Sequence, residues 1–207
     1  MLKKLSLITI IFGLASVLVA SNSFSTDPNA KIQKYEETTI IIPSDFSRTE
    51  DTIKYDGENS NNGIGLTNGG TYYGAVRFTT TDACTLKSAI FFQYQAVTAP
   101  GYVIIYGAGT STAPGAPIDS TPYTPAVGAW VRVNFPTPRY YAAGSDFWLG
   151  VRITHSAGTY PFGVDAGPSV TPARSYVSLD GTSWNSLVYY GLNYNWNLRA
   201  IGRFVRF

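Results

Sequence analysis

From residue 52 onward, the sequence is a series of short stretches in which apolar and polar residues alternate, separated by clusters of turn-forming residues. Residues 129–136 place Val131, Val133 and Phe135 on one side of an extended chain, and residues 146–154 repeat this pattern. Alternation with a period of two residues is typical of a strand that buries one face. A convincing helical period is not found in this region, so the pattern predicts an all-β fold.

Roughly eight to ten short strands with turn clusters between them are typical of a two-sheet sandwich. The expected strands are residues 53–56, 73–79, 85–95, 101–107, 129–136, 146–154, 160–165, 174–179 and 195–207. The glycine- and asparagine-rich residues 57–70 and the proline-rich residues 113–125 are expected to be connections. No internal repeat is visible, which argues against a propeller or a solenoid. The predicted fold class is a two-sheet antiparallel jelly-roll sandwich over residues 52–207.

Alternation also predicts which side chains face the core. One side of residues 85–95 is expected to carry Leu86, Ile90, Phe92 and Tyr94, and the other Lys87, Phe91, Gln93 and Gln95. In the closing strand, the expected core residues are Trp196, Leu198 and Ala200. Gly202 is expected to mark a bulge, because glycine inside a strand often allows one.

The charge balance excludes nucleic acid as a partner. The chain has 15 basic and 13 acidic residues, and without Lys3 and Lys4 of the N-terminal leader the basic count falls to 13, so the two are equal. No cluster of basic residues interleaved with aromatics is present. Cys84 is the only cysteine, so the chain has neither an intrachain disulfide nor a cysteine metal site. We expect Cys84 to be a small buried side chain.

The N-terminus has the plan of a secretory signal peptide, which we place at residues 1–23. Two lysines precede an apolar run over residues 5–20, and small residues follow. The run is shorter than most membrane-spanning helices, so an uncleaved anchor is the less favoured alternative. Export without disulfides or glycosylation sequons favours a prokaryotic protein that is secreted or held at the cell surface, with no membrane contact after cleavage.

Residues 24–51 form a polar extension with one β-rich run. The run consists of Thr38, Thr39, Ile40, Ile41 and Ile42 and stops at Pro43. An exposed apolar strand is a liability that proteins usually cover. The run is therefore expected either to pack on its own domain or to add to the sheet edge of a neighbouring subunit, which would give a homo-oligomer.

Several motifs resemble those of accessory jelly-roll domains in secreted bacterial and archaeal proteins, a group with carbohydrate-binding and adhesin-like members. The N-terminal motifs are Ile53-Lys54-Tyr55-Asp56-Gly57, Gly63-Ile64-Gly65 and Ala75-Val76-Arg77-Phe78. The C-terminal motifs are Phe147-Trp148-Leu149-Gly150, Tyr160-Pro161, Asp165-Ala166-Gly167-Pro168, Trp184 and residues 190–200. Together they span residues 52–205. The resemblance implies a non-catalytic sandwich that acts in binding, adhesion or spacing, and it assigns no ligand-binding residues.

Catalysis is not expected. His155 is the only histidine, lies at the end of an expected strand, and has no nucleophile elbow around it, so we interpret it as a surface loop residue. A glycosidase needs two carboxylates at a controlled separation. All the glutamates lie within residues 36–58, and most aspartates adjoin turn residues. The chain is therefore predicted not to be an enzyme.

No cofactor is expected, but one loop aspartate is a candidate calcium ligand. Asp165 lies in Gly163-Val164-Asp165-Ala166-Gly167-Pro168, and calcium takes loop carboxylates and backbone carbonyls. The favoured alternative is a turn in which the carboxylate binds the backbone. Asp56 and Glu58 are a second calcium candidate.

Aromatic and arginine side chains on the expected non-core faces suggest a binding surface. The candidates are Tyr73, Trp130 and Trp148, with Arg77, Arg132 and Arg152 on matching faces. Such residues form stacking platforms for sugar rings or protein partners. The favoured alternative is that they stack on one another and cover a sheet beneath a loop.

A second aromatic group, Tyr189, Tyr190 and Tyr194, lies in the expected loop before the closing strand. We therefore predict a secreted, non-catalytic binding or adhesion module whose partner is an extracellular glycan or protein. The alternative is a structural subunit of an extracellular assembly in which residues 38–42 complete a neighbour's sheet.

Overall fold

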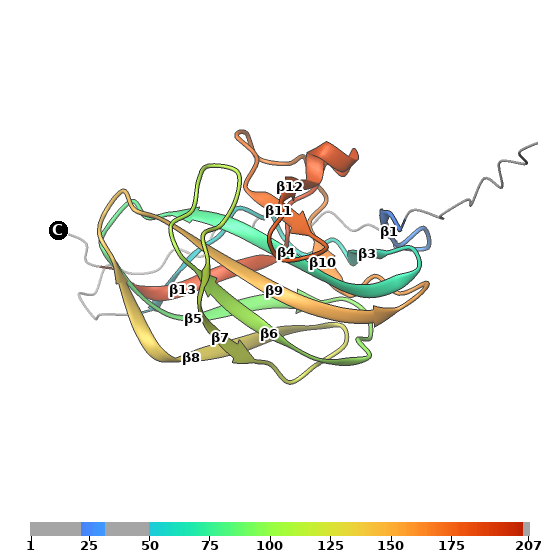
Figure 1. Cartoon of the computed structure of the whole chain (residues 1–207), viewed down its shortest axis with the longest axis horizontal. Coiled ribbons are helices and arrows are strands. Elements are labelled where there is room, and N and C mark those ends of the chain that lie inside the picture. Colours follow the sequence, from blue (N-terminus) through green and yellow to red (C-terminus); the bar gives the residue numbers. More distant parts are fainter. Residues whose placement is uncertain (1–21, 32–49, 205–207) are drawn as a thin grey trace, which may run out of the picture.

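The computed structural model describes residues 22–31 and 50–204, which form a sandwich of two antiparallel β-sheets (Figure 1). This confirms the predicted fold class. Most of the expected signal peptide and the whole of the run at 38–42 lie outside the described residues.

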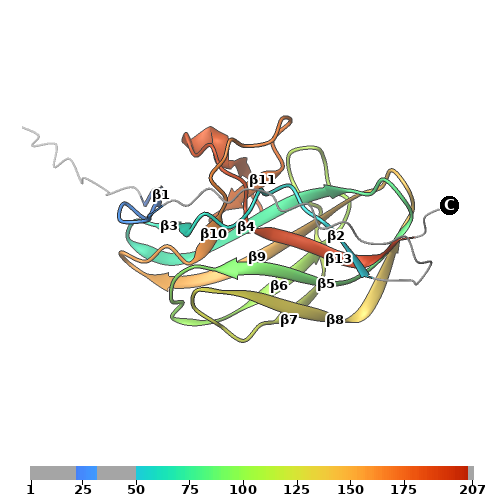
Figure 2. The same cartoon turned by 180° about the vertical axis from the view of Figure 1, so that it is seen from behind.

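The first sheet is built around β5 (Cys84–Gln93). One edge of β5 pairs with β8 (Ala129–Tyr141), and the other pairs with β13 (Leu198–Phe204) and, at its end, with β10 (Phe162–Val164). Beyond these lie β2 (Glu50–Ile53), which pairs with β13, and β3 (Asn62–Leu66), which pairs with β10 and with β1 (Phe24–Thr26). Figure 2 shows β5, β13 and β8 from behind.

The second sheet has the strand order β12-β11-β4-β9-β6-β7. Its strands are β12 (Asn185–Ser186), β11 (Ser175–Ser178), β4 (Gly69–Thr79), β9 (Asp146–Ser156), β6 (Ala99–Tyr106) and β7 (Pro117–Pro122). A short 3-10 helix, η1 (Leu187–Tyr190), follows β12. The connection between β6 and β7 and the segment carrying η1 project from the same side of the sandwich (Figures 1 and 2).

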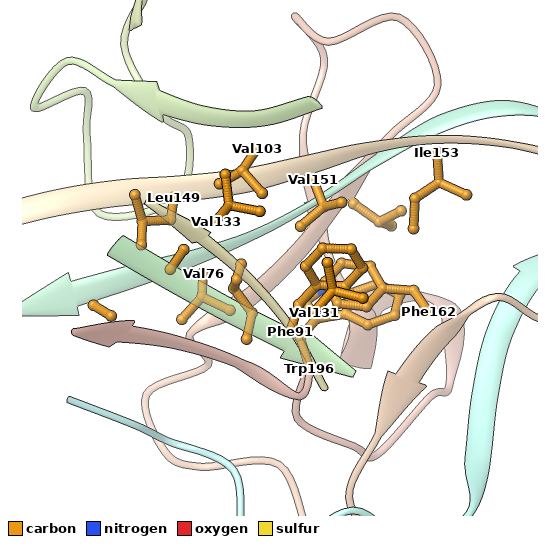
Figure 3. Close-up of a cluster of buried hydrophobic side chains, with 14 of the residues drawn as sticks. Val76, Phe91, Val103, Val131, Val133, Leu149, Val151, Ile153, Phe162 and Trp196 are labelled. Atoms are coloured by element: carbon orange, nitrogen blue, oxygen red, sulfur yellow. The ribbon is translucent and has the colours of Figure 1, made fainter. Parts of the chain in front are cut away.

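The core lies between the sheets, where the alternating side chains of both sheets meet (Figure 3). Phe162 of β10 and Trp196 stack almost in parallel, with ring centroids 4.2 Å apart. Gly74 of β4 faces this pair: a Cβ atom there would lie 2.6 Å from the Phe162 ring. A glycine at this position therefore lets two large rings pack against the opposite sheet.

Two strands form where the sequence predicts connections. β3 lies within residues 57–70, and its small residues Gly63 and Gly65 are packed against the backbone of residues 159–162. β7 lies within residues 113–125 and begins and ends with proline. β7 is the last strand of its sheet, where proline does not interrupt a ladder on both sides.

The predicted faces of residues 85–95 are wrong, because the β5–β8 register shifts between Leu86 and Ser88. Leu86 points into the core as expected, but beyond the shift Ala89 and Phe91 point inward, and Phe92 packs on Trp130 at the other face. The bulge expected at Gly202 is confirmed by a register shift between Ile201 and Gly202. Cys84 is buried as predicted.

Part of the predicted extension belongs to the sandwich. Phe24 of β1 pairs with Leu66 and is buried, with its ring edge-on to Tyr72 and Tyr190. The Asn22 side chain donates to the Gly69 carbonyl at 2.9 Å and accepts from the Asn68 amide at 3.0 Å. Residues 22–26 thus complete one end of the first sheet.

Within residues 22–31 and 50–204, no helix has the length and apolar character needed to cross a membrane.

Candidate ligand-binding face

The outer face of the second sheet carries a line of three side chains across neighbouring strands. In the strand register, Tyr73 of β4 lies opposite Arg152 of β9, and Arg152 lies opposite Tyr102 of β6. Opposed residues in an antiparallel pair point to the same side of the sheet, with Cβ atoms about 5 Å apart. We call these three residues the tyrosine–arginine row.

The row is open to solvent at one end and supported at the other. Tyr102 is 41% exposed, whereas Tyr73 and Arg152 are half-buried. Gly181, in the turn after β11, is packed against the Tyr73 ring, and a Cβ atom there would lie 3.3 Å from it. The turn therefore holds one ring of the row in place, and the other ring stays accessible.

Arg152 has no hydrogen-bond or ion-pair partner among the residues that the structure describes. Five other arginines in this part of the chain all have one, namely Arg77, Arg132, Arg139, Arg174 and Arg199. Arg203 also lacks a partner, but it is exposed on the first sheet. A half-buried arginine without an acceptor is unusual, because partial desolvation of a charged side chain is normally offset by a hydrogen-bond partner.

Trp148, expected to contact a ligand, is completely buried. It does lie on the outer face of the second sheet, but it belongs to a closed cluster there. The cluster consists of Ala75, Ile104, Tyr106, Trp148 and Tyr176, with Tyr73 and Trp184 packed against it. The Trp148 indole donates to the Ala108 carbonyl at 3.1 Å, so the β6–β7 connection covers it. Trp148 therefore stabilises the fold, and the alternative of a cover beneath a loop is confirmed for it.

Trp130 lies on the other sheet, so it cannot share a surface with Tyr73 and Arg152. The guanidinium of Arg199 is 4.2 Å from the centre of the Trp130 ring. Arg199 is fixed in turn by the buried carboxylate of Asp56, with a 2.6 Å contact. The exposed Arg132 on the same strand pairs with Glu50 at 2.6 Å. Arg199 therefore lies over the Trp130 ring, and Arg132 is paired with Glu50, so both arginines have partners within the chain.

Arg77, the other arginine on the outer face of the second sheet, lies near the Asp146 carboxylate at 3.6 Å. Its side chain is largely buried. Arg77 therefore has an acidic partner within the chain, unlike Arg152, which lies on the adjacent strand β9 and on the same face.

The three tyrosines near the C-terminus do not form one group. Tyr189 is 72% exposed and Tyr190 is partly exposed at the end of η1, whereas Tyr194 packs against the main core. The Ser186 hydroxyl caps η1 by accepting from the Tyr189 amide, and Gly191 ends it with a positive φ. The tip of this segment therefore presents Tyr189, but Tyr194 is a packing residue.

Asp165 is buried and its carboxylate accepts four N–H hydrogen bonds. The donors are the amides of Gly57, Gly167 and Asn195 and the Asn195 side chain, at 2.8 to 3.0 Å. The bond from Gly167, two residues on, is the turn predicted as the alternative to calcium. Donors surrounding both oxygens leave no lone pair directed at a cation. The second calcium candidate, Asp56, is occupied by Arg199 and Asn197.

The described residues contain no group of three or more histidine, cysteine or carboxylate side chains that could hold a metal ion.

The prediction that His155 is a surface residue is wrong. Its ring is buried between β3 and the end of β9, and Nε2 accepts from the Leu66 amide at 3.0 Å. Nδ1 lies 2.9 Å from the Ser156 carbonyl, which fixes the hydrogen on Nδ1. Burial lowers the pKa of His155, although the Ser156 and Thr159 contacts act in the opposite direction. Both ring nitrogens serve the structure.

Tyr102 and Trp184 are not among the ligand contacts predicted from the sequence. Tyr102 lies in a short, evenly apolar stretch in which alternation does not separate two faces. Trp184 stands alone in a turn region, yet it packs edge-on to Tyr106 beside the row. Strand register places Tyr102 opposite Arg152, and the contact with Tyr106 places Trp184 on the same outer-face cluster.

Comparison with known proteins gives a fold but no family. No family model matches the sequence, and no curated protein matches it. The chain resembles a solved structure of the cysteine protease and lectin-like domains of Cwp84, a surface-layer-associated protein of Clostridium difficile. The TM-score is 0.53 and the identity 14%, over 75% of this chain and 36% of that one.

A second structure, of the clostridial cysteine protease Cwp84 after propeptide cleavage, gives a TM-score of 0.50 and 14% identity, over 75% of this chain and 40% of that one. The chain thus spans well under half the length of either structure. At this identity, the likeness shows the fold alone.

Proposed function

We propose that this protein is an extracellular, non-catalytic binding module that holds a glycan on the outer face of its second sheet. The observation that carries this proposal is the tyrosine–arginine row, in which a guanidinium with no partner in the described part of the chain lies between two tyrosines on adjacent strands. Aromatic rings offer large contact areas to the C–H faces of sugars, and a guanidinium donates to their oxygens. Strands also hold such groups more rigidly than loops do.

The comparisons support this proposal at the level of the fold. The similar structure contains a lectin-like domain and comes from a surface-layer-associated protein. The sequence of residues 1–23 has the plan of a secretory signal peptide, which fits a location outside the cell.

Retention of the protein on polysaccharide gels tests the proposal. We expect Tyr102→Ala to lower the affinity by roughly ten-fold, because an exposed stacking ring contributes about 1–2 kcal/mol. Tyr140→Ala is the matched control, because Tyr140 is 67% exposed but lies on β8 of the first sheet. Equal retention of both variants and the unchanged protein, or no retention on any polysaccharide, would count against a glycan site here.

A second proposed role is that of a subunit in an extracellular assembly, with residues 38–42 adding to a neighbour's sheet. The supporting observation is that β2 is an edge strand of the first sheet and begins, in the sequence, shortly after this run. The molar mass of the protein from residue 22 onward, measured in solution, tests this role. Oligomers that dissociate when Ile41 is replaced by Asp are the expected result, and a monomer at high concentration would contradict it.

A further inference from the structure

We infer that the glycan held on this face carries carboxylate groups, as uronic acid polymers do, and that Arg152 binds one of them. The inference rests on the proposed function and names the class of its ligand. It follows from the surroundings of Arg152, where the described residues place two tyrosines beside the guanidinium and no acid paired with it.

The residues around Arg152 on its own face are uncharged. Tyr73 and Tyr102 flank it across the sheet, while Gly150 and Thr154 are its same-face neighbours along β9. Three acids in or beside the second sheet are engaged elsewhere: Asp146 lies near Arg77, Asp119 contacts Arg139, and Asp180 accepts from its own turn. Within residues 22–31 and 50–204, no acid is therefore paired with this guanidinium.

The neighbouring side chains also shape the approach to Arg152. The ring of Tyr106 covers Gly150, where a Cβ atom would lie 2.7 Å from ring carbon Cε2. This ring and the buried cluster behind it close one side of the tyrosine–arginine row. On the other side, the hydroxyls of Thr71 and Thr154 form a hydrogen bond of 2.8 Å with each other, and these short side chains make that side of the row polar. A ligand group can thus approach Arg152 from the side of the threonines and Tyr102.

Arg152 is the one arginine in the described part of this face without an acidic partner, and a single guanidinium suits a carboxylate better than a phosphate or a densely sulfated ligand. A planar carboxylate accepts two parallel hydrogen bonds from arginine. Dianionic and densely sulfated ligands are usually bound by several basic groups. Arg77, the other arginine on this face, is already near Asp146. The geometry therefore favours a singly charged, planar acid bound beside the exposed ring of Tyr102.

Affinity electrophoresis with three uronate polymers, namely polygalacturonate, alginate and hyaluronan, tests the inference. Each is compared with the same polymer after chemical reduction of its carboxyl groups. We expect at least one uronate polymer to bind ten-fold or more tightly than its reduced form. Arg152→Gln should lower that affinity by ten- to a hundred-fold, because a charge-assisted bidentate contact is lost, and should weaken binding of the reduced form far less, because only a hydrogen bond to a neutral oxygen is lost there.

Arg203→Gln is the matched control, because it removes the same charge from the other sheet and Arg203, too, has no partner among the residues that the structure describes. Its affinity should equal that of the unchanged protein. Arg152→Lys should recover part of the affinity, since it restores the charge without the planar fork. Dextran sulfate serves as a further probe of non-specific charge attraction. If Arg152→Gln and Arg203→Gln weaken the binding of dextran sulfate equally, and also weaken the binding of the uronate polymers equally, the attraction is non-specific and the inference is overturned.

The inference and the proposed function fail in different ways. If a neutral polysaccharide binds and Tyr102→Ala removes that binding, while no uronate polymer is preferred and Arg152→Gln has no effect, the inference is overturned and the glycan site stands. If no polysaccharide of either kind binds, both are overturned.

Discussion

The backbone amide of Leu66 donates a hydrogen bond to Nε2 of His155, 3.0 Å away, and so joins the first sheet to the end of β9. This bond exists only while the imidazole is neutral, because a protonated ring has no acceptor. The histidine expected at the surface is therefore a structural link between the two sheets.

Stability should fall as the pH falls below about 6.5, the ordinary pKa of histidine. Burial lowers the pKa of His155 in the folded protein, so unfolding takes up a proton in this range. The link contributes fully above pH 7 and is lost as the pH drops through the folded-state pKa. Urea midpoints at pH 8, 7, 6 and 5 measure this effect. His155→Gln keeps an acceptor but does not titrate and should show a flatter profile; identical profiles would refute the assignment.

Replacing Asp165 by Asn should lower the free energy of unfolding by about 2–4 kcal/mol, because amide hydrogens would then face buried N–H donors. Guanidinium unfolding measures the change. Asp119→Asn is the control, since it removes a half-exposed contact to Arg139 and should cost at most about 1 kcal/mol. Addition of calcium or EDTA should leave the Tm of the unchanged protein constant. A calcium-dependent rise in Tm that disappears in Asp165→Asn would contradict the hydrogen-bonding role.

Gly74→Ala should destabilise the protein by about 1–3 kcal/mol, because the added methyl group would press on the stacked rings of Phe162 and Trp196. Thermal unfolding measures the loss. Gly57→Ala is the control: Gly57 is exposed, and the nearest atom to an added Cβ is 3.9 Å away. Comparable Tm values for the two variants would mean that the core tolerates the extra volume by shifting.

Trp148→Ala should cost about 3–5 kcal/mol, because a fully buried indole and its hydrogen bond to Ala108 are removed. Tyr102→Ala, on the same face but exposed, should stay within about 0.5 kcal/mol of the unchanged protein. Chemical unfolding of the two variants distinguishes a packing residue from a surface residue. A Trp148→Ala protein of unchanged stability would mean that the β6–β7 connection does not cover this ring.

Phe24→Ala should destabilise the protein by about 2–4 kcal/mol, because Phe24 is buried against Tyr72 and Tyr190. Equilibrium unfolding of the protein from residue 22 onward measures the effect. Val127→Ala, at a position 62% exposed, should have almost no effect. If Phe24→Ala matched that control, the sandwich would not depend on β1.

Much of the fold follows from the sequence, because alternation reports directly on burial. β4, β8 and β9 each have one face toward the core, and their apolar residues recur at every second position. The predicted faces and strands are wrong where the pairing of strands does not follow the local alternation of apolar and polar residues. In β5, the register shifts after Leu86, so the residues beyond it that were expected on one face lie on the other. The strand propensities of these residues do not predict the shift. β3 is a glycine-rich strand because the neighbouring backbone leaves no room for side chains.

Some features of the candidate site also follow from the sequence, and others depend on tertiary contacts. The sequence by itself determined that Tyr73, Trp148 and Arg152 point away from the core, since this depends only on alternation within one strand. Tertiary structure alone decided that a loop covers Trp148, that Arg199 stacks on Trp130, and that Arg152 lies between Tyr73 and Tyr102 without an acid beside it. These are contacts between segments far apart in the chain. Strand register and loop path set them, and a single strand's pattern carries no information about either.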